Sequence, residues 1–155
     1  MSIVQPHRLV SRPVQESDIP RVLEDLPKLK AVLDNPLQGR VYCAVAHCQV
    51  TDKDPLQFFL AEPGRFKYDL IINPEIMRAT KAQVDSKEAC ISYPDKPPIT
   101  VQRSHKLTLH YQTYEEGKLV SVREDCNGAA AKIAQHEIDH FEARYIYDRE
   151  SSNGI

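Results

Sequence analysis

The amino-acid sequence predicts an α+β fold in which antiparallel β-sheets pack together with one helix near each end of the chain. Apolar residues recur at helical spacing in residues 19–33 and again in residues 128–147. The region between them carries short apolar runs separated by proline, glycine and charged residues, a pattern typical of strands. Two of these runs are joined by a short turn, which pairs them antiparallel.

The first helix is predicted from the spacing of apolar residues between Ile19 and Leu33, with Ser17 as its N-cap. Pro27 interrupts this pattern, because proline lacks the backbone N–H that a helix interior uses. We therefore expect either a kink or two short helical pieces. Gly39 is expected to end the region.

The central part of the chain is predicted to form five strands and one long loop. The loop is expected at Ser86–Pro98, where the sequence is polar and rich in proline. The residues Glu115, Glu116 and Gly117 form the hairpin turn between the last two strands. The strands are expected at Val41–Val50, Leu56–Ala61, Tyr68–Asn73, His105–Tyr114 and Lys118–Glu124.

The last helix is predicted over Gly128–Tyr147, where alanine is abundant, and Asn127 is placed as its N-cap. Within this helix, Ile133, His136, His140 and Ala143 form a single stripe.

Length, charge and cysteine content narrow the class of protein. The 155 residues are the size of one domain, so residues 1–155 are predicted to form a single domain. The net charge of −2 argues against direct nucleic-acid binding, and no apolar run is long enough to span a membrane. The start of the chain does not resemble a secretion signal, and the four cysteines do not resemble a disulfide framework. A cytoplasmic monomer is expected.

The residues that carry chemistry are His136, Glu137 and His140. Two histidines four residues apart lie on one face of a helix and can bind one metal ion, while a carboxylate beside the first can accept a proton from activated water. A surface helix with two solvated histidines is the alternative. The stripe favours the metal site, because it places both imidazoles among apolar residues, where an unpaired imidazole would be costly to bury.

A third protein ligand is expected from upstream, because catalytic metal sites commonly use three and no histidine follows His140. Cys90 is the best candidate, since it lies in a proline-bounded loop and a thiolate is a strong ligand. Cys43 and Cys48 are weaker candidates, because strand alternation would direct them to opposite faces. We expect these two and Cys126 to be buried reduced thiols.

Three motifs in order resemble those of the peptide deformylase family. Glu88–Ser92 is similar to its E-G-C-L-S motif, Gln135–Phe141 to its Q-H-E-x-D-H-L motif, and Val45–Val50 to its first motif, which ends in glutamine. The run Ile72–Glu75 and the dipeptide Asp148-Arg149 also fit the sequence pattern of this family. The resemblance covers nearly the whole chain and identifies it as a divergent member. It implies that antiparallel sheets pack around the C-terminal metal-binding helix.

The resemblance implies a metal-dependent hydrolase that removes the N-formyl group from N-formylmethionyl peptides and releases formate. Its partners would be N-formylated nascent peptides, met near the ribosome exit. One divalent ion would be bound by Cys90, His136 and His140, natively Fe(II), although Zn, Ni or Co would suit the same ligands. Glu137 would be the general base and acid, with the Gln49 amide and the backbone N–H of Ile91 holding the developing oxyanion.

The peptide-binding cleft is the part that departs from the family. The resemblance assigns four residues to it, Ala44, Ala89, Ala129 and Ile133, and the first two stand where the family has glycine. Ala143 replaces a further glycine after the third motif. These changes leave two alternatives open: a paralogue that acts on another formamide, and a metal-holding protein that binds without turnover.

Three further polar residues near the motifs are given mainly structural roles. His47 is expected to be a structural histidine rather than part of the cleft. Arg103 and Glu88 are expected to pair, either to orient a metal ligand or as a plain surface pair. Asp139 is expected to support the site or form a surface ion pair rather than to act in catalysis.

Overall fold

The computed structural model describes residues 3–35 and 42–148 and confirms the α+β class with antiparallel sheets. Short 3₁₀ turns lie at Glu16–Asp18 and His47–Gln49. The helices and strands are α1 Ile19–Asp34, β1 Ala44–Ala46, β2 Phe58–Ala61, β3 Leu70–Ala79, β4 Gln83–Glu88, β5 Ile99–Ser104, β6 Lys106–Glu115, β7 Lys118–Asn127 and α2 Ala129–Phe141. None of the described helices is long and apolar enough to cross a membrane.

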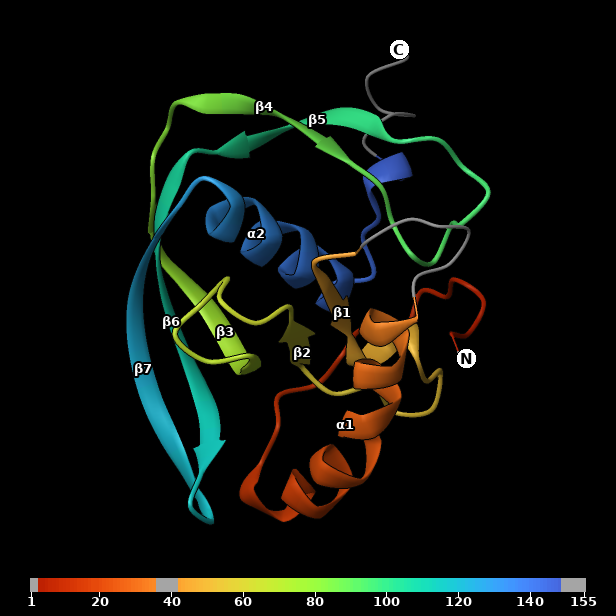
Figure 1. Cartoon of the computed structure of the whole chain (residues 1–155), viewed down its shortest axis with the longest axis vertical. Coiled ribbons are helices and arrows are strands. Elements are labelled where there is room, and N and C mark those ends of the chain that lie inside the picture. Colours follow the sequence, from red (N-terminus) through yellow and green to blue (C-terminus); the bar gives the residue numbers. More distant parts are fainter. Residues whose placement is uncertain (1–2, 36–41, 149–155) are drawn as a thin grey trace.

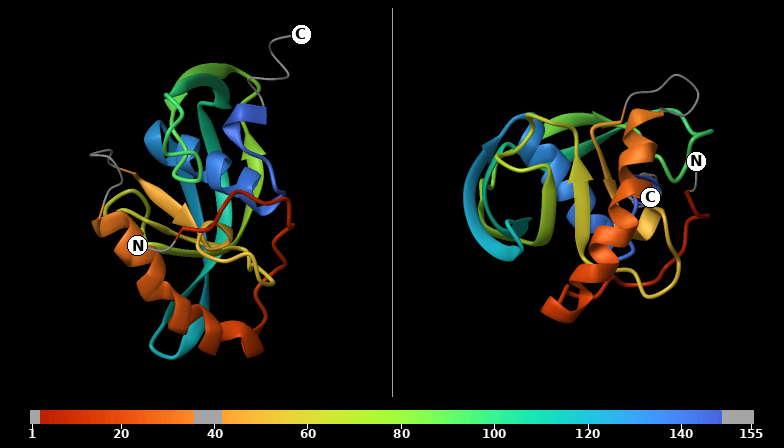
Figure 2. Two further views of the ribbon diagram at one scale, coloured as in Figure 1. Left: turned by 90° about the vertical axis from the view of Figure 1, so that its right-hand side faces the viewer. Right: turned by 60° about the horizontal axis from the view of Figure 1, so that its bottom comes forward.

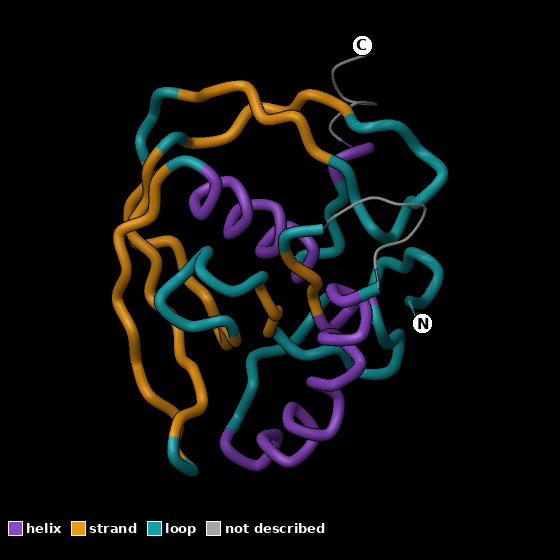
Figure 3. The backbone as a smooth tube through the Cα atoms, viewed as in Figure 1, coloured by secondary structure: helices purple, strands orange, loops and turns teal. Residues whose placement is uncertain are grey.

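The strands form two antiparallel sheets around α2 (Figure 1). The larger sheet has the order β1-β2-β3-β6-β7, and the smaller one pairs β4 with β5. β4 and β5 pass over α2 on the side away from α1, and a loop runs from the end of β4 to the start of β5 (Figures 1 and 3). The metal-ligand motif on α2 therefore lies between the two sheets.

The short strands at the start of the larger sheet are apolar on both faces because each face is covered by a helix. Ala44, Ala46 and Phe59 pack in the cluster that contains α2 residues. Their neighbours Val45 and Phe58 pack in the cluster that contains α1 residues. Since successive side chains of a strand alternate between faces, β1 and β2 separate the two helices, as Figure 2 also shows.

α1 runs as one helix through Pro27, so two separate pieces do not form. The carbonyl that loses its donor belongs to Leu23, a residue that is 40% exposed. The buried face of α1, with Val22 and Leu29, continues past the proline. The predicted N-cap was wrong by one residue, because Asp18 occupies the N-cap position, without a capping hydrogen bond from its side chain. Gly39 lies outside the described residues.

The predicted strand at Val41–Val50 was too long: β1 covers three residues, and the chain then turns at His47–Gln49. The Gln49 side chain accepts a hydrogen bond from the Ala46 backbone N–H at 2.9 Å, and the Val50 N–H donates to the His47 carbonyl. The argument from strand alternation for Cys43 and Cys48 therefore does not apply, because Cys48 is not on a strand.

The prediction of a loop over Ser86–Pro98 was wrong at its start, and β5 was missed. Residues 86–88 belong to β4, which pairs in register with β5. The inward face of this small sheet carries Ser86, Glu88 and Arg103, which hydrogen-bond to one another. Val101 is buried on the same face, but these polar groups interrupt the alternation of apolar and polar residues that signals a strand.

The other strands were found with shifted ends, and the hairpin turn was found at Glu116 and Gly117, whereas Glu115 belongs to β6. β3 runs on to Ala79 and β7 to Asn127. Glu116 and Gly117 both have positive φ, at 50° and 78°, as a two-residue type I′ turn requires.

α2 ends at Phe141, earlier than the predicted Tyr147, and begins after Gly128 rather than after Asn127. Ala143 has φ +61°, its N–H donates to the His140 carbonyl, and the Arg144 N–H donates to the Asp139 carbonyl. This hydrogen-bond pattern is a Schellman motif, in which glycine usually takes the left-handed position. The missing glycine explains why the helix end could not be recognised in the sequence.

Ala143→Gly is expected to stabilise the protein by about 0.5–1 kcal/mol. The left-handed conformation costs alanine about 1–2 kcal/mol, and the greater chain entropy of glycine offsets part of the gain. Urea unfolding followed by circular dichroism measures the change. Ala130→Gly, in the first turn of α2, should destabilise by about 0.5–1 kcal/mol. If Ala143→Gly and Ala130→Gly destabilise the protein equally, the left-handed conformation of Ala143 is not strained.

Candidate metal centre

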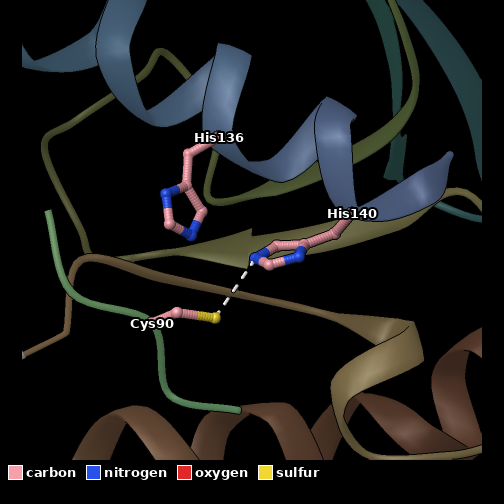
Figure 4. A group of neighbouring side chains, drawn as sticks. All are labelled: Cys90, His136 and His140. Carbon is pink, nitrogen blue, oxygen red and sulfur yellow. Dashed lines mark hydrogen bonds between the residues drawn. The ribbon is translucent and has the colours of Figure 1, made fainter. Parts of the chain in front are cut away.

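Cys90, His136 and His140 form the one group of possible metal ligands found within the described residues. α2 directs both imidazoles to the same side, toward the Cys90 thiol on the loop after β4 (Figure 4). One ligand atom from each residue lies within 4.8 Å of the others, and Cys90 and His140 are 1% exposed. The helical spacing and the loop thus bring together the three residues expected to bind a metal.

The separations suit a tetrahedral metal ion. The Cys90 Sγ is 3.7 Å from the His140 Nε2. With metal–sulfur and metal–nitrogen bonds of about 2.3 and 2.1 Å, tetrahedral angles place two such atoms about 3.6 Å apart. The donor set of one thiolate and two imidazoles also suits Fe(II), Zn, Ni and Co. The residues present therefore fit a divalent ion.

The other cysteines stand apart from this group. Burial raises the pKa of Cys48 and of Cys126 to about 12, so both remain thiols at neutral pH. The Cys48 Sγ lies 3.7 Å from the His140 carbonyl oxygen rather than from its ring. Cys43 is half-buried, less than predicted, and lines the neighbouring pocket.

His136 is held in place by a buried ion-pair network. Its Nδ1 lies 2.7 Å from the Glu88 carboxylate, which accepts two hydrogen bonds from Arg103 and one from Ser86. Arg103 is 1% exposed and also binds Asp139 at 2.8 Å. The Glu88–Arg103 pair is thus not a plain surface pair: it fixes the His136 ring with its Nε2 directed toward Cys90 and His140.

The pKa values follow from this arrangement. Burial would raise the pKa of Glu88, but hydrogen bonds from His136 and Arg103 outweigh it and hold this pKa far below its usual range. Burial lowers the pKa of His136, yet contacts with Cys90 and Glu88 raise it to about 10. Burial and the charge of His136 keep the pKa of His140 well below its usual value. The His140 imidazole is therefore neutral and free to coordinate a metal ion.

Glu137 lies beside the ligand group with its carboxyl buried. It is 3% exposed, and its Oε2 has no hydrogen-bond partner among the described residues. Burial raises its pKa to about 7. A carboxyl group in this environment can change its protonation near neutral pH, as an acid–base catalyst must.

Gln49 directs its amide NH₂ toward the ligands. Its Oε1 accepts the Ala46 N–H, while its Nε2 lies 3.0 Å from the Ser92 Oγ and 3.6 Å from the Cys90 Sγ. Ile91, directly after Cys90, is buried at the same place. The 3₁₀ turn that ended β1 early is what gives Gln49 this position.

A pocket of about 290 Å³ opens beside these groups. All four residues assigned to the cleft line it: Ala44, Ala89, Ala129 and Ile133. Its wall also includes Gln49, Ile91, His136 and Glu137. Neither Ala44 nor Ala89 has positive φ, so the loss of glycine at these two positions causes no backbone strain.

Sequence reasoning missed some lining residues, among them Tyr42 and Lys132. Lys132 could have been found, because it precedes His136 by four residues on the same helical face. His47 does not line the pocket: its ring accepts the Leu56 N–H at Nδ1 and meets Asp25 at Nε2, in agreement with a structural role.

Comparisons with known proteins agree with this geometry. A family model described as "Polypeptide deformylase" matches residues 7–154. The chain is 30% identical to a peptide deformylase of Phenylobacterium zucineum, over 94% of this chain and 84% of that one. It is 32% identical to a peptide deformylase of Thermotoga neapolitana over 60% of this chain. That match spans 54%, or about half, of the length of the Thermotoga relative.

Solved structures share the fold. The peptide deformylase of Thermotoga maritima superposes with a TM-score of 0.70 at 26% identity, covering 91% of this chain and 88% of that one. A class I type b peptide deformylase of Acinetobacter baumannii superposes with a TM-score of 0.75 at 22% identity, covering 96% and 99%. Because the family match covers almost all of the sequence, this chain belongs to the polypeptide deformylase family.

Proposed function

We propose that this protein removes the formyl group from N-formylmethionyl peptides and releases formate. The observation that carries the proposal is the convergence of Cys90, His136 and His140 on one point, with the buried Glu137 beside them at the wall of a pocket. We further propose that residues 1–155 act as one cytoplasmic domain, as a monomer, on nascent peptides near the ribosome exit.

Cys90, His136 and His140 would hold one divalent ion, and Fe(II) is the proposed native metal. When bound, such an ion polarises a carbonyl group and makes water more acidic. The thiolate brings one negative charge to the site, so water there is less acidic than it would be beside three neutral ligands. A nearby carboxylate base is therefore useful, because it can accept the proton of that water. The network of Glu88 and Arg103 would keep the His136 ring in its binding orientation.

Glu137 would take a proton from the attacking water and return it to the amine that leaves. Its Oε2 is free to do so, because no other described residue bonds to it. The Gln49 NH₂ would donate a hydrogen bond to the oxygen of the tetrahedral intermediate, and the Ile91 backbone N–H would be the second donor. The Ala46–Gln49 hydrogen bond fixes this amide in advance of the substrate.

Glu88→Gln is expected to weaken metal binding by about 10- to 100-fold, the usual effect of losing an outer partner of a ligating histidine. Gln keeps the size of the side chain but removes the charge that orients His136 and pairs with Arg103. Competition with a chelator measures the affinity. Glu75→Gln, on the exposed part of β3, is the control with the same chemical change. Unchanged affinity in Glu88→Gln would contradict the positioning role.

The proposed function is tested by formate release from formyl-Met-Ala-Ser and, in parallel, from small formamides, under anaerobic conditions with Fe(II) or Ni(II) loaded. We expect one formate for each new free amine. Turnover of small formamides but of no formyl-Met peptide would favour a paralogue with another substrate. Full metal content without any formate would indicate a binding protein. The assay separates the three alternatives.

A further inference from the structure

The pocket wall contains a cation that none of the proposed catalytic steps uses. Lys132 lines the pocket from α2, one helical turn before His136, and is half-buried. Within residues 3–35 and 42–148 it forms no side-chain hydrogen bond or ion pair. A charged side chain at the wall of a substrate pocket with no protein partner is available to a charged ligand.

The carboxylates that line the pocket, and Asp139 farther along α2, are already engaged or lie in the reaction centre. Glu88 is bound by Arg103 and His136, and Asp139 is bound by Arg103. Glu137 lines the same pocket as His136 and is the proposed base. The pocket therefore presents an uncompensated positive charge beside the apolar surface of Ala129 and Ile133.

Lys87 also borders the pocket, but it differs from Lys132 in direction. It lies between Ser86 and Glu88, whose side chains bond to each other on the site face of β4. Because side chains alternate along a strand, the exposed Lys87 side chain lies on the opposite face. Of the two lysines that line the pocket, Lys132 is thus the one that is half-buried on the helix that carries the histidine ligands.

We propose that Lys132 selects formyl-Met peptides that carry an acidic side chain at the second or third residue. This inference rests on the proposed function and names the substrate class of the same site. Lys132 is about 6 Å along the helix axis from His136. If the peptide extends along α2 from the ligand group toward Lys132, as this proposal requires, its second and third residues lie about 3 and 7 Å beyond the first and within reach of the ammonium.

An acidic side chain should raise kcat/KM more at one of the two substrate positions, the second or the third residue, than at the other. Successive side chains of an extended peptide point to opposite sides, so only one of them turns toward α2. The carboxylate would form a partly exposed ion pair with Lys132, an interaction worth about two- to fivefold in kcat/KM. The terminal carboxylate of a short peptide has the same chemistry and has to be tested separately.

The test compares kcat/KM for two amidated series, formyl-Met-Xaa-Ser-NH₂ and formyl-Met-Ala-Xaa-NH₂, with Xaa as Glu, Gln or Lys. Glu and Gln have the same shape, so their ratio isolates the charge. We expect Glu to exceed Gln by about two- to fivefold in one series. Formyl-Met-Ala-Ser is measured in parallel as the free acid and as the amide.

Lys132→Glu should reverse the preference, so that the Lys peptide becomes the better substrate, while metal content stays unchanged. Lys118→Glu, on the exposed end of β7 away from the pocket, makes the same change in net charge and should keep the wild-type ratio. These variants separate a local ion pair from long-range attraction.

Equal rates for Glu and Gln in both series would overturn the proposal, as would a Glu preference that survives in Lys132→Glu or disappears in Lys118→Glu. A preference for the free acid without any preference for Glu would also overturn it. If the metal-loaded wild type deformylates none of these peptides, the proposed function itself fails. If it deformylates all of them equally, only the role of Lys132 fails.

Discussion

Cys90→Ala is expected to reduce the affinity for the divalent metal by more than about a hundredfold. Removing an outer partner of a ligand already costs about 10- to 100-fold, and this change removes a ligand and its negative charge. The two remaining imidazoles leave the ion one protein ligand short of the three that catalytic sites commonly use. Equilibrium dialysis against a chelator, followed by metal analysis, measures the affinity.

The remaining cysteines supply matched controls. Cys43→Ala and Cys126→Ala remove a thiol outside the ligand group and should each leave one metal ion per chain. Cys48→Ala tests the thiol that contacts the His140 carbonyl rather than its ring. Cys90→Ser introduces a residue of nearly the native size, so it serves as a second variant if Cys90→Ala fails to fold. Thermal unfolding of the metal-free protein checks the folding of both variants. Full metal affinity in both Cys90 variants would remove the ligand assignment.

How much of the site could be predicted depends on the distance over which its residues interact. His136, Glu137 and His140 lie within one helical turn, so their relation is a property of local geometry and was readable directly. Cys90 joins them only through the path of β4, which pairs with β5 and passes over α2. The sequence by itself made Cys90 the best candidate and left Cys43 and Cys48 as weaker ones, and the family motif agreed with Cys90.

The fold was predicted best where one side of an element faces the core. β6 and β7 alternate clearly and were found, whereas β4 and β5 were missed because Ser86, Glu88 and Arg103 satisfy one another on the inward face. β1 was overextended because the Gln49 side chain, rather than a further strand pair, takes the Ala46 N–H. The polar residues that support the metal ligands are thus the same residues that made these strands difficult to predict from the sequence.

Glu137→Gln is expected to lower kcat by at least about a hundredfold while leaving the metal bound, since a general base commonly contributes that much or more. Gln has the size of Glu but cannot accept a proton from water or return one to the leaving amine. Glu137 is not one of the three ligand residues, so the affinity for the ion should change little. Steady-state kinetics on formyl-Met-Ala-Ser at matched metal content measures the loss.

The buried position of Glu137 also bears on the stability of this variant. Its Oε2 already has no protein partner among the described residues, and burial already disfavours the charged carboxylate, so the neutral amide of Gln should change the free energy of unfolding little. Thermal unfolding has to be measured beside kcat, so that the loss of activity is compared at equal folded fraction. Glu142→Gln, at the exposed end of α2, makes the same change outside the pocket and should leave both quantities near wild type. Retention of near wild-type kcat in Glu137→Gln would show that another group accepts the proton. A large loss of kcat with full metal content would instead show that Glu137 acts in proton transfer and not in metal binding.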